Sequence, residues 1–248
     1  MSVVTITSTS NNLVKHVVKI REDSSYRQEH QQVLVSGRKV VAEIAQIFCP
    51  LKIFVEKTYE EYPHASEICK ISPPVLKKIT GLVNPEGIAA LFKLPKPMLL
   101  DNKKRILVTE DIADPGNLGT LMRTALALGF EGIFLLGKGV DPFHDKVLRA
   151  SRGALFKLNY EMGNWQRLLE LTKNRRDHCF VADIHGEPLN NIARQHELIL
   201  LLSNESQGVS AHASNFGKKI CIPMAGPMES LNVSIAGAIL MYNLSASN

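Results

Sequence analysis

Short apolar runs alternate with polar stretches along the chain, and their spacing switches between the periods of strands and of helices. In the first part of the chain this pattern predicts a small α/β unit. Its expected helices span residues 11–20 and 39–47, and its expected strands span residues 32–35, 51–55 and 87–94.

The alternation is more regular in the second part of the chain. Strands are expected at 105–109, 132–136, 179–182, 198–202 and 219–222, with helices at 117–128, 146–150, 165–173 and 231–244. Strands that alternate with helices predict a mostly parallel sheet covered on both faces. Ligands of such sheets bind beyond the carboxyl ends of the strands, so the informative residues should lie just after the strands.

A break in the pattern separates the two parts. Pro95 and Pro97 precede the polar run 101–105, which is typical of a linker. We therefore expect a first domain over 1–97, a linker over 98–104 and a second domain over 105–248.

Composition excludes several classes of protein. The 248 residues are 45% hydrophobic and 21% charged, which argues against disorder, and the longest apolar stretches fall short of the roughly 20 residues that cross a membrane. The N-terminus has no basic stretch followed by an apolar core, so no secretory signal is expected. The four cysteines are scattered and form no ligand pattern, which predicts reduced thiols, no metal and a cytoplasmic protein.

Positive charge is concentrated at the N-terminal side. Residues 1–105 carry 16 Lys and Arg against 10 Asp and Glu, a balance of +6, whereas the balance over 106–248 is −1. A basic part joined to a near-neutral one suggests that the first part attracts a polyanion such as nucleic acid. Because an excess of +6 over 105 residues is modest, charge alone slightly favours a solvated basic surface without a partner.

Three loops that follow predicted strands carry unusual chemistry. In the first loop, Pro115 and Gly116 form a turn, and Asn117 is expected to cap the next helix. Leu121, Ala125 and Leu128 would face the core at helical spacing. Arg123 falls off that stripe and is expected to project toward the mouth of the loop.

The second and third loops are polar or irregular. Residues 203–208 follow the apolar strand 198–202 and would turn backbone groups outward, as an adenine or ribose requires, while Glu205 would pair with Arg123 or hold a ribose hydroxyl. Residues 222–234 contain two prolines and a glycine, and Ser230 or Asn232 would cap the final apolar helix. The chain has no G-x-G-x-x-G after a strand and no Walker loop, which argues against the common nucleotide-binding motifs.

At these three loops the sequence resembles the SpoU/TrmH branch of the SPOUT RNA methyltransferases. The motif N-x-G-x-x-x-R-[ST]-A appears at 117–125, a variant of G-x-E-x-x-G appears at 203–208, and I-P-M-x-G-x-x-x-S-L-N-V-S is matched in full at 222–234. Residues 141–154 are similar to the middle signature of the family. Matches to its N-terminal substrate-binding domain are looser and include Ser8, Asn12, Lys15, Arg27 and Gly37.

The resemblance implies a fold and an activity. The fold would be a small N-terminal domain like ribosomal protein L30e and a C-terminal domain with a deep trefoil knot, which works as a homodimer. The activity would be methyl transfer from S-adenosylmethionine to a ribose 2′-hydroxyl of RNA, with ribosomal RNA of the 23S type preferred over transfer RNA by family analogy alone.

The resemblance also implies which residues act. The expected catalytic residues are Asn117, Arg123, Glu205, Ser230 and Asn232. The expected cofactor-binding residues are Leu202, Ser203, Glu205, Gly208, Ile222, Met224, Ser230 and Leu231. Arg123 would activate the hydroxyl electrostatically, because a guanidinium stabilises the forming alkoxide.

One residue departs from the family pattern. Ser203 stands where members usually have glycine, and a side chain there would weaken cofactor binding if the backbone needs a positive φ. Two other classes of function stay open: a non-catalytic RNA-binding protein with the same fold, and a methyltransferase of small molecules. The five expected catalytic residues are all present, which favours the enzyme over the binding protein, and the basic first part would have no role in the last alternative.

Overall fold

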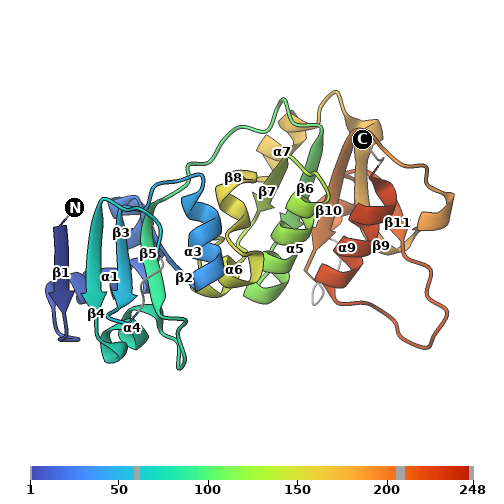
Figure 1. Ribbon diagram of the computed structural model, residues 1–248. Coiled ribbons are helices and arrows are strands. Elements are labelled where there is room, and N and C mark those ends of the chain that lie inside the picture. Colours follow the sequence, from blue (N-terminus) through green and yellow to red (C-terminus); the bar gives the residue numbers. More distant parts are fainter. Residues whose placement is uncertain (1, 59–61, 205–209, 246–248) are drawn as a thin grey trace. The chain divides into compact units, whose positions relative to one another are not determined.

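The computed structural model describes residues 2–58, 62–204 and 210–245. The chain forms two compact units, the first made of residues 1–96 and 143–153 and the second of residues 97–142 and 154–248. Figure 1 shows the sheet and the helices of each unit. No helix within the described ranges is long and apolar enough to cross a membrane.

Unit 1 is built on a mixed five-stranded sheet in the order β1-β4-β3-β5-β2. Neighbours β1, β4 and β3 run parallel, whereas β5 runs antiparallel to β3 and to β2. Its strands are β1 (Ser2–Ile6), β2 (Gln32–Ser36), β3 (Lys52–Glu56), β4 (Glu67–Ile71) and β5 (Ile88–Lys93), and its helices are α1 (Asn12–Glu22), α2 (Ser24–His30), α3 (Arg38–Ala45), α4 (Pro73–Thr80) and α6 (Asp145–Ser151).

Four of these elements were not predicted from the sequence: β1, α2, β4 and α4. The helix α4 begins with Pro73 and Pro74 and ends at Gly81 in the left-handed region, with φ 67°. Proline suits the first turn of a helix because its missing N–H has no partner there, so the proline pair marks a helix start rather than a loop. The strands β1 and β4 have five residues each, as do the predicted strands β2 and β3, so length does not account for their omission.

Unit 2 is built on a six-stranded sheet in the order β11-β9-β10-β6-β7-β8, and every neighbouring pair is parallel. Its strands are β6 (Arg105–Glu110), β7 (Gly132–Leu136), β8 (Asn159–Gly163), β9 (Cys179–Pro188), β10 (Leu198–Ser203) and β11 (Lys218–Cys221). Its helices are α5 (Pro115–Ala127), α7 (Trp165–Leu171), α8 (Ala211–Ser214) and α9 (Val233–Leu244), with single 3₁₀ turns at Ala154–Phe156, Arg176–His178 and Leu189–Asn191. The predicted α/β fold with a parallel sheet is thus confirmed.

The pairing of β9 with β11 is interrupted at one point. Lys219 lies opposite Val181, but the next residue, Ile220, lies opposite Glu187. The five residues 182–186 are therefore left out of the ladder on the β9 side. A Cβ on Gly186 would lie 2.4 Å from the backbone nitrogen of Ile220, so only glycine permits the return of the two strands to contact.

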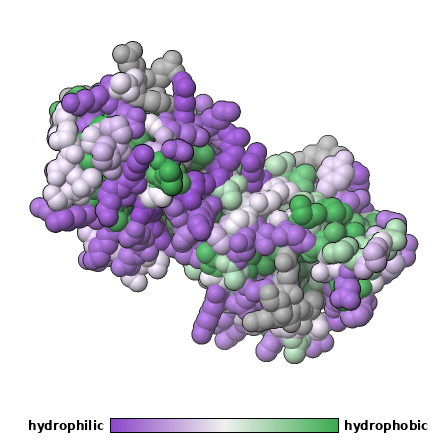
Figure 2. Space-filling view, turned by 90° about the horizontal axis from the view of Figure 1, so that it is seen from below, coloured by the Kyte–Doolittle hydropathy of each residue, from purple (hydrophilic) through white to green (hydrophobic). Residues whose placement is uncertain are grey.

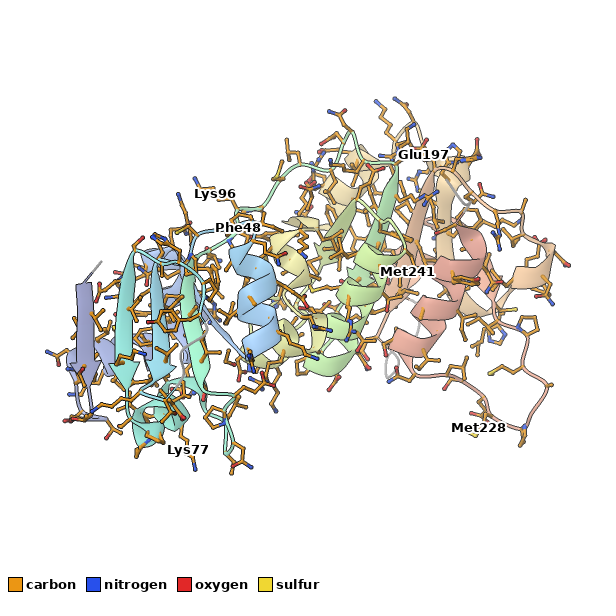
Figure 3. All side chains as sticks on the ribbon, viewed as in Figure 1. Phe48, Lys77, Lys96, Glu197, Met228 and Met241 are labelled. Atoms are coloured by element: carbon orange, nitrogen blue, oxygen red, sulfur yellow. The ribbon has the colours of Figure 1, made fainter. Side chains whose placement is uncertain are left out.

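The surfaces of the two units differ in hydropathy. In Figure 2 hydrophilic residues dominate the visible face of unit 1, whereas hydrophobic residues gather on the visible face of unit 2. Within unit 2, Met241 of α9 is buried, while Met228 in the loop before α9 is 69% exposed and extends away from the sheet (Figure 3). This loop, between β11 and α9, borders the candidate site.

Candidate functional site

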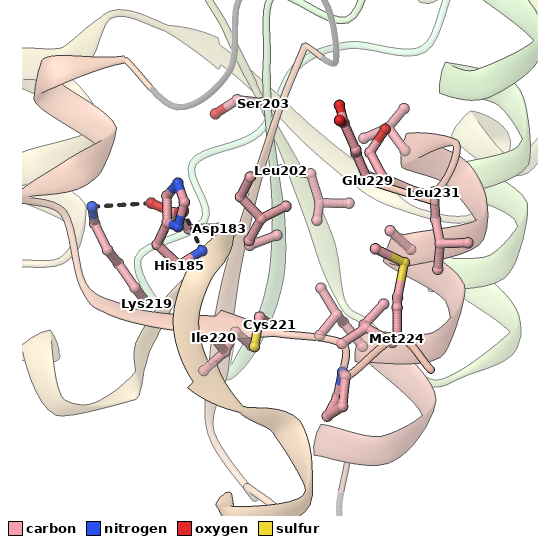
Figure 4. Close-up of a pocket in the computed structure, with 18 of the residues that line it drawn as sticks. Asp183, His185, Leu202, Ser203, Lys219, Ile220, Cys221, Met224, Glu229 and Leu231 are labelled. Atoms are coloured by element: carbon pink, nitrogen blue, oxygen red, sulfur yellow. Dashed lines mark hydrogen bonds and ion pairs between the residues drawn. The ribbon is translucent and has the colours of Figure 1, made fainter. Parts of the chain in front are cut away.

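A cavity of about 830 Å³ lies in unit 2, where β10 and β11 end and the loop before α9 passes (Figure 4). Ligand sites of parallel sheets are expected at this end of the strands. Six of the predicted cofactor-binding residues line the cavity, namely Leu202, Ser203, Ile222, Met224, Ser230 and Leu231. The other two, Glu205 and Gly208, lie outside the described residues.

One wall of the cavity is charged. Lys219 Nζ lies 3.0 Å from Asp183 Oδ2, and the backbone N–H of His185 donates to Asp183 Oδ1 at 2.9 Å. Burial disfavours the charged form of Asp183, but the hydrogen bond from His185 and the ammonium of Lys219 outweigh it, so the pKa of Asp183 lies below its usual value. Asp183 is therefore ionised at neutral pH.

This wall was missed from the sequence. Asp183, His185 and Lys219 line the cavity together with Cys221 and Glu229, and none of the five was predicted. Residues 183–186 come directly after the predicted strand 179–182, and the rule that ligand sites follow strands could have identified them. The position of Lys219 opposite this run depends on the register change between β9 and β11, which no local pattern encodes.

Asn117 does not cap its helix, contrary to prediction. The helix α5 begins two residues earlier, at Pro115, and its N-cap is Asp114, whose Oδ1 accepts from the backbone N–H of Asn117 at 2.7 Å. An aspartate followed by proline is a strong helix start. The side chain of Asn117 is consequently available, and its Oδ1 accepts from Asn232 Nδ2 at 2.9 Å.

Asn232 is the N-cap of α9, as one of the two predicted alternatives had it. Its Oδ1 accepts from the backbone N–H groups of Ser234 and Ile235 and from Ser234 Oγ. Since its Nδ2 donates to Asn117, the cap of α9 and the start of α5 are joined by one side-chain hydrogen bond. The first and third predicted loops thus meet at this point.

Arg123 is exposed on α5 and lies off the apolar stripe, while Leu121 and Ala125 of the same helix are buried, as predicted. Leu128, also predicted to face the core, follows the helix and is half-buried. Among the residues that the structure describes, Arg123 makes no hydrogen bond or ion pair and does not line the cavity. The structure therefore brings Asn117 to Asn232 but does not bring Arg123 to either.

Ser203 does not occupy a backbone conformation that requires glycine. It is the last residue of β10, lies opposite Glu110 of β6 in the ladder, and has no positive φ. Its hydroxyl donates to Glu110 Oε2 at 2.7 Å. The concern that a side chain is strained at this position is thereby removed.

The fold and the cavity define a class of protein: an α/β enzyme whose all-parallel sheet presents a ligand site at the carboxyl ends of its strands. The family model described as SpoU rRNA Methylase family matches residues 104–242, and the chain belongs to this family. The predicted family is confirmed, and with it the class of enzyme, an RNA ribose 2′-O-methyltransferase that depends on S-adenosylmethionine.

Relatives match the whole chain rather than unit 2 alone. An uncharacterized tRNA/rRNA methyltransferase of Synechocystis is 30% identical, with 97% of this chain and 93% of the relative covered. The 23S rRNA (guanosine(2553)-2′-O)-methyltransferase RlmP of Bacillus subtilis is 29% identical, with 96% and 98% covered. The crystal structure of an S-adenosylmethionine-bound rRNA methyltransferase from Sinorhizobium meliloti aligns with a TM-score of 0.84 at 25% identity, with 98% and 97% covered.

The cavity fits this cofactor in size and chemistry. Its volume falls within the range of about 300–1,000 Å³ usual for small-molecule and cofactor sites. Apolar side chains such as Leu202, Met224 and Leu231 line it together with a few polar groups, which is the usual composition of such a site. No group of three or more His, Cys, Asp or Glu side chains in the described part of the chain is placed to hold a metal ion.

Proposed function

We propose that this protein methylates a ribose 2′-hydroxyl of ribosomal RNA and binds S-adenosylmethionine in the cavity at the ends of β10 and β11. The observation that carries the proposal is the convergence on this cavity of five residues from the second and third motifs, together with Leu202 directly before the second motif. The ribosomal substrate is supported by the Bacillus subtilis relative, whose similarity extends over both units. Transfer RNA is the alternative substrate.

The bound cofactor supplies a methyl group activated by a positively charged sulfur. In the proposed site Leu202, Met224 and Leu231 pack against the cofactor, and Ser203 and Ile222 offer backbone groups to it. Ser230 borders the same cavity just before α9. Glu205 and Gly208 complete the proposed set through the second motif.

Arg123 acts on the nucleophile in this proposal. A ribose hydroxyl is a poor nucleophile until its proton leaves, and a fixed positive charge beside it stabilises the alkoxide that forms. A guanidinium does not give up its proton in proteins, so we assign Arg123 electrostatic activation and positioning of the adjacent phosphate, and not proton removal. Its lack of a described partner leaves its donors available for RNA.

Asn117 and Asn232 orient the reacting groups through the hydrogen bond that joins α5 to α9. An amide nitrogen has two N–H donors, and the bond between the two residues uses only one, on Asn232 Nδ2, so each residue can also donate to the ribose. Glu205 would hold Arg123 or the ribose.

Unit 1 is proposed to bind RNA, since the excess positive charge lies in residues 1–105. We also carry over the trefoil knot and the homodimer of the family, and we place the reaction in the cytoplasm, in keeping with four free cysteines. Two large side chains on α9, Ile235 and Tyr242, are 52% and 64% exposed and would lie in the dimer interface.

The substitution Arg123→Ala tests the assignment. We expect methyl transfer into RNA to fall at least 100-fold, in line with the loss of one oxyanion-stabilising group. The dissociation constant for S-adenosylmethionine should stay within about twofold, because Arg123 does not line the cavity. Transfer at the wild-type rate by this variant would remove Arg123 from the mechanism.

A further inference from the structure

A buried carboxylate links the edge of the cavity to α8. Glu110, the last residue of β6, is only 5% exposed. Its Oε2 accepts from Ser203 Oγ at 2.7 Å, and its Oε1 accepts from Ser210 Oγ at 2.7 Å. Each oxygen of the carboxylate thus takes one serine hydroxyl.

The two serines have different structural positions. Ser203 ends β10 and lines the cavity (Figure 4), and its neighbour Asn204 donates from Nδ2 to the backbone oxygen of Asp111 at 3.1 Å. Ser210 is the N-cap of α8, and its Oγ accepts from the backbone N–H of Ala213 at 3.1 Å. The hydroxyl of Ser210 therefore donates to Glu110 and accepts from the helix at once.

Removing either hydroxyl would leave one oxygen of a buried carboxylate without its partner. Hydrogen bonds to charged groups contribute more than neutral ones, and an unpartnered buried charge is costly. Glu110 therefore favours only those arrangements in which Ser203 and Ser210 both face it. The Ser203 hydroxyl is thus held by Glu110.

We propose that Glu110 is a positioning residue of the cofactor site: it holds Ser203 and Ser210 together and so keeps the wall of the cavity in the shape that binds S-adenosylmethionine. The cofactor named here rests on the proposed function. Ser203 then contributes to the affinity for the cofactor, and its replacement by glycine weakens cofactor binding.

Calorimetry with S-adenosylmethionine on the full-length protein measures the effect. Ser203→Gly, Ser210→Ala and Glu110→Gln should each raise the dissociation constant about tenfold, the order expected for one charge-assisted hydrogen bond. In turnover assays the KM for S-adenosylmethionine should rise while kcat stays near the wild-type value. Equal or tighter binding by Ser203→Gly would overturn the proposal.

Glu161→Gln is the matched control. Glu161 is also a glutamate that is 5% exposed in a strand of the same sheet, but it binds Arg167 and the backbone N–H of Leu100, and neither of these partners lines the cavity. This variant should lose stability and keep the cofactor affinity. If it weakens binding as much as Glu110→Gln does, the effect is general destabilisation and Glu110 has no positioning role.

A double-mutant cycle tests whether Ser203 affects cofactor binding through Glu110 or independently of it. In a Glu110→Ala background, Ser203→Gly should cause no further loss of affinity for S-adenosylmethionine, because the carboxylate that accepts from the Ser203 hydroxyl is already absent. Additive losses would contradict the proposal.

Hydrogen–deuterium exchange without cofactor gives a readout that does not depend on the proposed function. The amide of Ala213 should exchange at least tenfold faster in Glu110→Ala than in the wild type, since the cap residue Ser210 loses its anchor. Unchanged exchange would refute the role of Glu110. Failure of the wild type to bind S-adenosylmethionine would instead refute the proposed function, while the exchange experiment would still decide on Glu110.

Discussion

Asn232 has two tasks at the start of α9. Its Oδ1 caps the helix by accepting from Ser234 and Ile235, and its Nδ2 donates to Asn117 on α5. The first task concerns stability, and the second sets the relative placement of two residues that the reaction is proposed to use. Capping uses Oδ1, and the contact with Asn117 uses Nδ2. A shorter residue that still caps the helix therefore keeps the first task and loses the second.

The substitution Asn232→Ser should keep the cap and break the contact with Asn117. Serine caps helices nearly as well as asparagine, so the free energy of unfolding should change by less than about 0.5 kcal/mol. Methyl transfer should nevertheless fall at least tenfold, because serine is too short to reach Asn117.

Asn232→Ala is the comparison variant, since it loses both tasks and should also lose about 1 kcal/mol of stability. Thermal unfolding and turnover of both variants check this prediction. Full activity of Asn232→Ser would show that the contact with Asn117 is dispensable.

At the scale of elements, α9 packs closely against α5 and the sheet through a glycine. A Cβ on Gly237 would lie 2.5 Å from Leu121 Cδ2 of α5 and 2.6 Å from Leu202 Cδ1 of β10. Leu202 also lines the cavity, so the packing of α9 and the shape of the site depend on the same side chain. The end of a leucine side chain can move, and the open space into which Leu202 can move is the cavity.

Gly237→Ala should therefore affect binding more than stability. Alanine favours a helix over glycine by about 1 kcal/mol, which offsets much of the cost of crowding Leu121 and Leu202. The displaced Leu202 narrows the cavity, and we expect the dissociation constant for S-adenosylmethionine to rise about tenfold.

Gly163→Ala in β8 provides the control for crowding. A Cβ there would meet Phe134 Cζ at 2.6 Å, and neither residue lines the cavity. This variant should unfold at a lower temperature and bind the cofactor normally. Calorimetry with S-adenosylmethionine on both variants measures the two dissociation constants. Normal binding by Gly237→Ala would show that the packing of α9 does not affect the cofactor site.

Elements with a clear hydrophobic pattern were predictable from the sequence, and elements without one were not. The spacing of Leu121 and Ala125 placed α5, and the apolar run 198–202 placed β10. The helix α8 has only four residues, and β8 has only Tyr160 and Met162 as large apolar residues, so neither carries such a pattern. The start of α5 was misplaced because Asp114 and Asn117 are both good caps and only the fold selects between them.

At the scale of the molecule, the site combines loops that are far apart in sequence. The hydrogen bond between Asn117 and Asn232 spans 115 residues, and the ion pair of Asp183 with Lys219 forms where β11 changes register along β9. The motifs predicted that Asn117 and Asn232 belong to one site, and the two residues are in contact. The ion pair depends on how two strands pair, which local patterns do not contain.

Cysteine labelling tests whether the cavity holds the cofactor. Cys221 lines the cavity, whereas Cys49 is exposed in unit 1. Burial raises the pKa of Cys69 to about 11 and that of Cys179 to about 12, so both thiols should stay unlabelled at pH 8.

Saturating S-adenosylmethionine should slow the labelling of Cys221 at least fivefold and leave Cys49 unaffected, which makes Cys49 an internal control. Mass spectrometry of the labelled peptides reads out both rates. Equal labelling of Cys221 with and without cofactor would place the cofactor elsewhere.

The central claim is methyl transfer to a ribose 2′-hydroxyl of ribosomal RNA, and one measurement tests it most directly. Ribosomal and transfer RNA that lack the modification are incubated separately with the protein and methyl-labelled S-adenosylmethionine, and the products are hydrolysed in alkali. A methylated 2′-oxygen blocks cleavage at its own linkage, so we predict label in alkali-resistant dinucleotides from ribosomal RNA and none from transfer RNA. Label released in mononucleotides, or found only in transfer RNA, would contradict the account.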